Sequence, residues 1–76
     1  MDLDEQEWED FSRRVKAARR AAGLSQGEIT KRTGISQGTL SAIEGMNVNP
    51  SLATILRLAK GLGVPAHSFF IDAPPA

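Results

Sequence analysis

Glycine and serine divide this chain into short segments, and each segment carries apolar residues at the three- and four-residue spacing of an amphipathic helix. Ser25, Ser36 and Ser51 each precede such a segment, where a hydroxyl can accept a hydrogen bond from a free backbone N–H. Gly23 and Gly34 each follow a segment, a position that favours glycine. Because no stretch alternates apolar and polar residues as a β-strand does, the sequence predicts an all-α fold.

The pattern predicts five helices, over about residues 5–22, 26–33, 37–44, from the Ser51 cap to the glycines near position 62, and within 64–70. Ser25 and Glu28 have the Ser-x-x-Glu spacing of a capping box. The inward stripe of the first helix comprises Trp8, Phe11, Val15, Ala18 and Ala22. That of the fourth comprises Leu52, Ile55, Leu56, Ala59 and Leu62, with Leu58 also apolar. These residues suffice for one small core in one domain.

Charged residues are segregated along the chain. Six of the nine acidic residues lie in the first ten positions, whereas all nine basic residues lie beyond them. The formal net charge of zero therefore hides a net charge of +6 on residues 11–76. We expect an acidic leader over residues 1–10 that runs into the first helix, a basic domain over 11–70 and a Pro/Ala tail over 71–76. A basic domain of short helices points to nucleic acid.

Composition argues against several other classes of protein. The chain has no cysteine, so neither a disulfide nor a thiolate metal site stabilises it, and a cytoplasmic protein is the simplest interpretation. Its apolar runs are far shorter than the roughly 20 residues that cross a bilayer, and its acidic start is no signal peptide. His67 lacks neighbouring metal ligands, and no catalytic set suggests an enzyme or a cofactor. Four aromatic residues are few for binding single strands by stacking.

The second and third expected helices are joined by Thr33-Gly34-Ile35-Ser36, which is the pattern of a helix-turn-helix. A capped second helix presents backbone N–H groups that suit a phosphate. The tight turn then directs the helix over residues 37–44 across it, so that its first residues can enter the major groove of DNA.

Longer motifs resemble one known family. They are Leu24-Ser25-Gln26, Gly34-Ile35-Ser36-Gln37, Leu40-Ser41-Ala42-Ile43-Glu44, Asn49-Pro50-Ser51-Leu52 and Leu62-Gly63-Val64. With them the chain resembles the lambda-repressor-like, Xre-type DNA-binding domain of phage repressors, SinR-type regulators and restriction–modification controller proteins. The resemblance covers about residues 11–70 and implies a compact five-helix bundle.

The resemblance also implies roles for individual residues. Bases would be read by Gln37, Gly38, Ser41 and Ala42. Phosphates would be bound by Gln26, Ser36, Thr39, Asn47 and Asn49. A structural ion pair would join Arg19, late in the first helix, to Glu44 at the end of the third.

Three departures from the family pattern bear on function. Gln37 is the only long side chain on the reading face, so few base contacts, or close approach with shape readout, are expected. The loop after Glu44 lacks the usual basic residues, so its phosphate contacts would come from Asn47 and Asn49. Thr30 stands where the family favours alanine, at the crossing of the second and third helices, and its bulk is expected to open that crossing slightly.

The sequence thus predicts a sequence-specific regulator of transcription, of repressor or controller type, that binds a palindromic operator in double-stranded DNA as a homodimer. Dimer contacts are expected at Phe69, Phe70 and Ile71, with the Trp8 end of the first helix as the next candidate. The protein would be cytoplasmic and nucleoid-associated, of bacterial or phage origin, without a membrane partner. Two alternatives stay open: the DNA-binding domain of a longer, effector-sensing regulator, and an antitoxin or bridging module that binds a protein.

Overall fold

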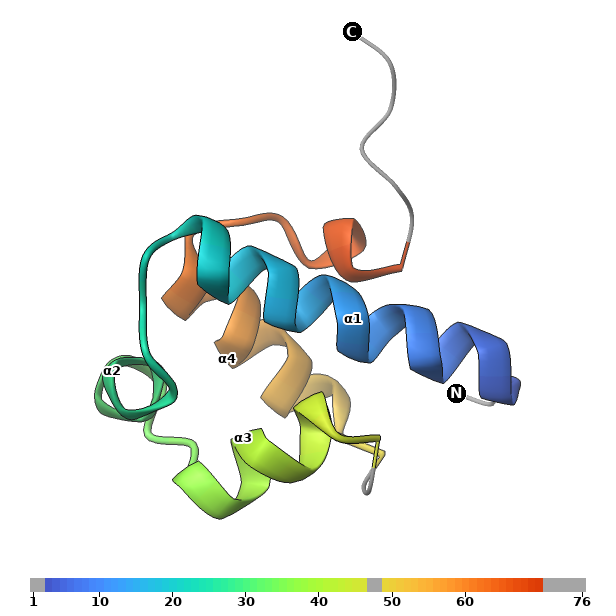
Figure 1. The fold of residues 1–76 in the computed structure, drawn as a ribbon, viewed down its shortest axis with the longest axis horizontal. Helices are drawn as coiled ribbons and strands as arrows, with labels where there is room; N and C mark the ends of the chain where they lie inside the picture. Colours follow the sequence, from blue (N-terminus) through green and yellow to red (C-terminus); the bar gives the residue numbers. More distant parts are fainter. Residues whose placement is uncertain (1–2, 47–48, 71–76) are drawn as a thin grey trace, which may run out of the picture.

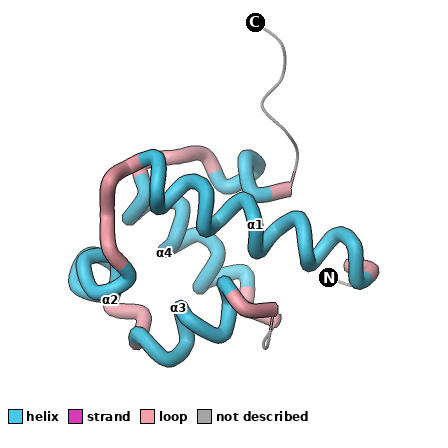
Figure 2. Tube along the Cα trace, viewed as in Figure 1, coloured by secondary structure: helices cyan, strands magenta, loops and turns pink. Residues whose placement is uncertain are grey.

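The computed structural model describes residues 3–46 and 49–70, and this part of the chain is all-helical (Figures 1 and 2). Its α-helices are α1 (Glu5–Ala21), α2 (Gln26–Thr33), α3 (Gln37–Glu44) and α4 (Leu52–Leu62). A short 3-10 helix, η1 (Ala66–Phe69), follows them. The predicted all-α fold is confirmed, and the fifth helix is a single 3-10 turn.

Each α-helix begins at a side-chain cap, in accord with the sequence pattern. Ser25 Oγ accepts a hydrogen bond from the Glu28 N–H at 3.1 Å, and the Glu28 carboxylate accepts one from the Ser25 N–H at 3.0 Å. The backbone and side-chain hydrogen bonds with Ser25 hold the pKa of Glu28 below its usual range. Asp4 and Glu7 form an equivalent capping box at the start of α1. Residues 5–10 of the acidic leader therefore belong to α1, and Asp4 caps it.

The helices enclose one apolar core. α2 packs on α3 and α4, and α1 contacts α3 and η1 (Figure 1). The largest fully buried side chains are Phe11, Val15, Ile29, Leu40, Ile43, Ile55, Leu58 and Phe69. Phe11 lies at its aromatic centre, with its ring centroid 5.8 Å from that of Phe69 and 5.4 Å from that of Phe70. Trp8 packs edge-on against Phe11 and extends this cluster to the surface.

The predicted inward stripe of α4 is wrong at two positions. Leu52 and Leu56 are exposed, at 66% and 52% of their full accessible area, whereas Leu58 is completely buried. α4 is turned so that its buried face consists of Ile55, Leu58, Ala59 and Leu62, which also have the three- and four-residue helical spacing. Ala22, expected at the end of the first stripe, is likewise exposed. Two leucines are thus left on the outer surface of α4.

The contact between α2 and α4 depends on Gly61. A methyl group added at Gly61 would overlap the methyl group of Thr33, so the two helices approach more closely than any larger residue allows. Thr30, also on α2, has a buried hydroxyl without a hydrogen-bond partner in the described structure. An unsatisfied buried hydroxyl costs about 1–3 kcal/mol.

None of the described helices is both long and apolar enough to traverse a lipid bilayer.

Candidate nucleic-acid interface

The turn between α2 and α3 is held by local hydrogen bonds. Gly34 has a φ of 76° and ends α2 in the left-handed conformation. The Thr33 hydroxyl donates to the Ile29 carbonyl at 2.7 Å and accepts from the Ile35 N–H at 3.1 Å. Ile35 is buried, so the turn is anchored to the core as well as to α2. The direction in which α3 leaves α2 is consequently well defined.

α3 has one buried and one exposed side. Leu40 and Ile43 are in the core, whereas Gln37, Gly38 and Ser41 are exposed. The remaining expected base-reading residue, Ala42, is half-buried at the edge of this surface. The structure thus brings the four expected base-reading residues onto one accessible helix and leaves Gln37 as its long polar side chain.

Ser36 and Thr39 interact at the start of α3. Ser36 Oγ accepts from the Thr39 N–H at 3.1 Å and donates its proton to Thr39 Oγ1 at 2.8 Å. The hydroxyl proton of Ser36 is therefore already used, whereas that of Thr39 can still be donated outward. Of these two expected phosphate ligands, Thr39 retains the better donor.

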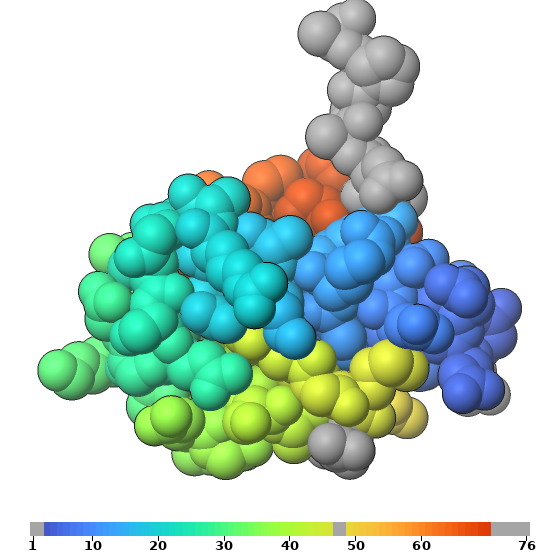
Figure 3. Space-filling model, in the orientation of Figure 1, coloured from blue at the N-terminus to red at the C-terminus, as the bar shows by residue number. Residues whose placement is uncertain are grey.

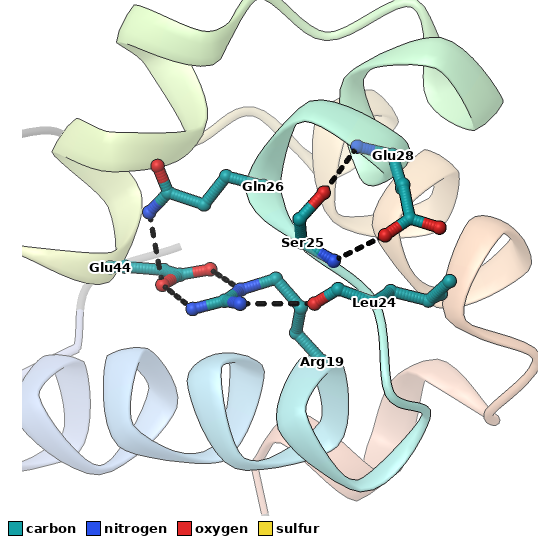
Figure 4. A network of polar contacts seen from close by, with 6 residues as sticks. All are labelled: Arg19, Leu24, Ser25, Gln26, Glu28 and Glu44. Carbon is teal, nitrogen blue, oxygen red and sulfur yellow. Dashed lines mark hydrogen bonds and ion pairs between the residues drawn. The ribbon is translucent and has the colours of Figure 1, made fainter.

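Arg19 and Glu44, expected to pair, join α1 to the end of α3 (Figure 4). Arg19 Nε lies 2.8 Å from Glu44 Oε2, and Arg19 Nη2 lies 3.0 Å from Glu44 Oε1. Arg19 Nη1 also donates to the Leu24 carbonyl at 3.0 Å, just before α2. The Gln26 amide adds a hydrogen bond to Glu44 Oε1 at 3.2 Å. This network joins α1 and the start of α2 to the end of α3. Its link to Gln26 was missed in the sequence.

Glu44 remains charged in this network. Its side chain is only 3% exposed, and burial by itself would raise its pKa. Hydrogen bonds from Arg19 and Gln26, with the charges of Arg19 and Lys16, outweigh burial and hold the pKa of Glu44 below its usual range. The same hydrogen bond to Glu44 raises the pKa of Arg19. Gln26, expected to bind phosphate, is the first residue of α2. Its hydrogen bond to Glu44 holds its side chain beside the capped start of that helix.

The loop after α3 begins with an unusual backbone conformation. Gly45, at the end of α3, has an ordinary φ of −96°, whereas Met46 adopts a φ of 63°. A left-handed conformation costs a non-glycine residue about 1–2 kcal/mol. Asn49 is exposed, as a phosphate ligand requires, and Asn47 lies outside the described residues.

One of the three expected dimer contacts requires correction. Phe69 is completely buried within a single chain, because η1 folds it against Phe11, so it cannot form a surface contact. Phe70 is half-buried and stacked on Phe11, and Ile71 lies outside the described residues. Within residues 3–46 and 49–70, the large exposed apolar side chains are instead Leu52 and Leu56 on α4, with Met46 at 39% exposure.

Two capped helices joined by a tight glycine turn, with a polar face open on the second, define a helix-turn-helix module. The family model described as "Helix-turn-helix domain" matches residues 10–68. The chain belongs to this family and is an Xre-type, lambda-repressor-like DNA-binding domain. Relatives of this domain are named as regulators of transcription.

Three similar proteins illustrate the match. The "Uncharacterized HTH-type transcriptional regulator y4dJ" of Sinorhizobium fredii is 46% identical over 46 residues, which are 60% of each chain. The regulator SutR of Escherichia coli is 34% identical over 65 residues, 86% of this chain but only 35% of SutR. The chain thus matches about three fifths of the first relative and a third of the second. The restriction-modification controller protein C.AhdI from Aeromonas hydrophila superposes with a TM-score of 0.82 at 29% identity, covering 86% of this chain and 98% of C.AhdI.

Proposed function

We propose that this protein is a sequence-specific regulator of transcription that binds double-stranded DNA with α3 in the major groove. The observation that carries the proposal is the polar face of α3, which is exposed while its opposite side is fixed in the core. Gln37, on the first turn, can bond both N6 and N7 of an adenine. Ser41, one turn later, offers a single hydroxyl. Specificity in each half-site then depends mainly on Gln37.

Gly38 supports a close approach of α3 to the bases. A side-chain carbon built at Gly38 would meet no protein atom within 4 Å, so packing does not require glycine there. Within a helix, glycine is less stable than alanine by roughly 0.5–1 kcal/mol. Glycine at this exposed position is explained if α3 lies so close to the base edges that a methyl group would collide with DNA.

The operator would be palindromic and the protein a homodimer, with Leu52 and Leu56 of α4 at the two-fold axis. In a symmetric dimer, the same surface of both protomers lies in the contact, so residues at the axis meet their own copies. An uncharged surface is favoured there. Leu52 borders a hollow of about 310 Å³ whose wall includes Trp8, Pro50 and Ile55, and a partner's leucine could occupy it. The surface around Phe70 instead includes the charged residues Glu7, Asp10 and Arg14, whose charges would have to be desolvated in a dimer contact.

The proposal is tested by selecting bound sequences from a pool of random duplexes and titrating the selected site. A two-fold symmetric consensus is expected, with an association constant that falls steeply with salt as phosphates are neutralised. Binding that ignores sequence would contradict the proposed specificity. No binding to any duplex at low salt would favour the alternative of a protein-binding module, which the acidic start of α1 makes the next candidate.

The partial match to SutR favours one variant of the proposal, in which this domain is the DNA-binding part of a longer regulator. Such a regulator would add an effector-sensing domain to the same α3 readout. Expression of the chain from its native gene, with the mass of the product measured, separates the two variants.

A further inference from the structure

A shallow basic groove lies beside the reading helix. It is a hollow of about 360 Å³, lined on α1 by Arg13, Lys16 and Arg20 and at its far wall by Gly45 and Met46, after the end of α3. The three cations are spaced by three and four residues, so they occupy one face of α1. Figure 3 shows the surface of α1, in blue to cyan, next to the end of α3, in yellow.

The positive charge of this groove is largely unneutralised within the described structure. Glu44, which also borders the groove, is hydrogen-bonded to Arg19 and Gln26, and it interacts with Lys16 by charge alone. Arg13 reaches Asp10 at 3.5 Å, but its side chain is 60% exposed, and such an ion pair contributes little. The other acidic residue of the lining is Glu9, at the end of the groove nearest the start of α1.

The groove also lies next to the loop that lacks basic residues. Residues 45–49 contain no lysine or arginine, so this loop cannot neutralise phosphate. We propose that the groove formed by Arg13, Lys16 and Arg20 binds phosphates of the DNA backbone beside the base pairs that α3 reads. α1 thereby supplies the charge that the loop after α3 does not. This inference rests on the proposed function and extends the DNA footprint to α1.

A second basic cluster on the molecule provides a matched control. Arg32, Arg57 and Lys60 surround a hollow between α2 and α4 that no residue of α3 lines. Arg32 donates to the Gly61 carbonyl at 3.4 Å, and Lys60 lies in the last turn of α4, where a helix dipole favours cations. The ends of α2 and α4 therefore account for Arg32 and Lys60 without a ligand.

The test compares two variants on the selected operator and on random duplex. The first replaces Arg13, Lys16 and Arg20 by glutamine, and the control replaces Arg32, Arg57 and Lys60 by glutamine, so both variants lose three positive charges. The groove variant should bind both the operator and random duplex more weakly, by a similar factor, and its base preference should not change. Its plot of log association constant against log salt should be flatter by about 0.9 for each phosphate that the variant no longer neutralises, or roughly 2–3 in total. The control variant should change this slope by less than about one.

A change of opposite sign strengthens the test. Glu9→Gln removes the acid at the end of the groove and should raise affinity for random duplex several-fold at low salt. Glu5→Gln, one turn earlier on α1 and outside the lining of the groove, should raise it less. Circular dichroism and thermal melting verify that each variant remains folded.

The outcomes separate the groove from the proposed function. If wild type selects a specific site but the groove variant keeps its affinity and salt slope, the groove inference is overturned and the proposed function stands. Equal effects of the groove and control variants would also overturn it, because net charge alone would then explain both. If wild type binds no duplex at all, the proposed function itself fails.

Discussion

α3 and α4 are both amphipathic helices with one face in the core, yet they leave opposite kinds of surface outside. α3 exposes Gln37 and Ser41, and its end is held by the ion pair of Glu44. α4 exposes Leu52 and Leu56, and its inner face is held mainly by apolar contacts, with one hydrogen bond from Arg32 to the Gly61 carbonyl. Under the proposed function, the surface that would meet base edges lies on a helix whose end is held by an ion pair, and the surface that would meet a second protomer lies on a helix held by packing. Substitutions on either helix can test this difference.

Removal of the ion pair should have the largest effect. Arg19→Ala leaves the Glu44 carboxylate buried and unpaired, and should lower the free energy of unfolding by about 2–4 kcal/mol. Thermal or urea denaturation measures this change. A loss below about 0.5 kcal/mol, the usual size of a surface substitution, would show that the network does not anchor α3.

The same ion pair predicts how stability depends on pH. The pKa of Glu44 is lower in the folded chain than its ordinary value of 4.5, so its stabilisation is complete above that value. As the pH falls below 4.5 and through the lower folded pKa, the wild type should lose this contribution progressively. Urea denaturation between pH 7 and pH 3 should therefore give a smaller difference between wild type and Arg19→Ala at the acid end. A difference that is constant over this range would contradict the charged state of Glu44.

If the protein dimerises through α4 as proposed, substitution of the α4 leucines should weaken the dimer strongly. Burial of one leucine contributes about 1.5–3 kcal/mol, so Leu52→Gln with Leu56→Gln should raise the dimer dissociation constant by about 100-fold or more. Sedimentation equilibrium measures this constant, with Lys60→Gln as a matched control on α4. Stability of the monomer should change by less than about 1 kcal/mol, because both side chains are exposed. A double variant that stays dimeric, while Phe70→Ala dissociates without unfolding, would return the dimer contact to η1.

Substitution on α3 should affect binding and not assembly. Gln37→Ala should cost about 1–3 kcal/mol on the selected operator and relax the preference at one base pair in each half-site. Random-duplex affinity should hardly change, since phosphate contacts dominate it. Equal losses on both kinds of DNA would make Gln37 a phosphate ligand.

The smallest expected change concerns Gly38. Gly38→Ala should raise the free energy of unfolding by about 0.5–1 kcal/mol, because helix propensity improves and no protein atom obstructs the new methyl group. Operator affinity should nevertheless fall, as measured by fluorescence anisotropy. Increased stability with unchanged affinity would mean that α3 does not approach the bases closely at this residue.

Local chemistry explains what the sequence predicted well. Ser25, Ser36 and Ser51 cap their helices, and Gly34 ends α2, because each of these choices depends on a few neighbouring backbone groups. The contact between Arg19 and Glu44, found from a family resemblance, could not have been derived from spacing, since 25 residues separate the partners.

Non-local packing explains what the sequence did not predict. In α4 the positions 52, 55, 56 and 59 have the same helical spacing as 55, 58, 59 and 62, so periodicity could not choose between the two faces. The surrounding helices made that choice by burying Leu58. Phe69 and Phe70 were separated in the same way, by the turn of η1 against Phe11.

The close approach at Gly61 has a consequence for the operator. It packs α2 closely against α4, the helix that bears Leu52 and Leu56. The short turn after α2 passes this constraint on to α3. In a dimer assembled on α4, the orientation of each α3 relative to the two-fold axis would be fixed. The distance between the two α3 helices would therefore be fixed as well. An operator lengthened by one base pair between its half-sites would rotate one half-site by about 34–36° around the duplex and engage only one protomer at a time.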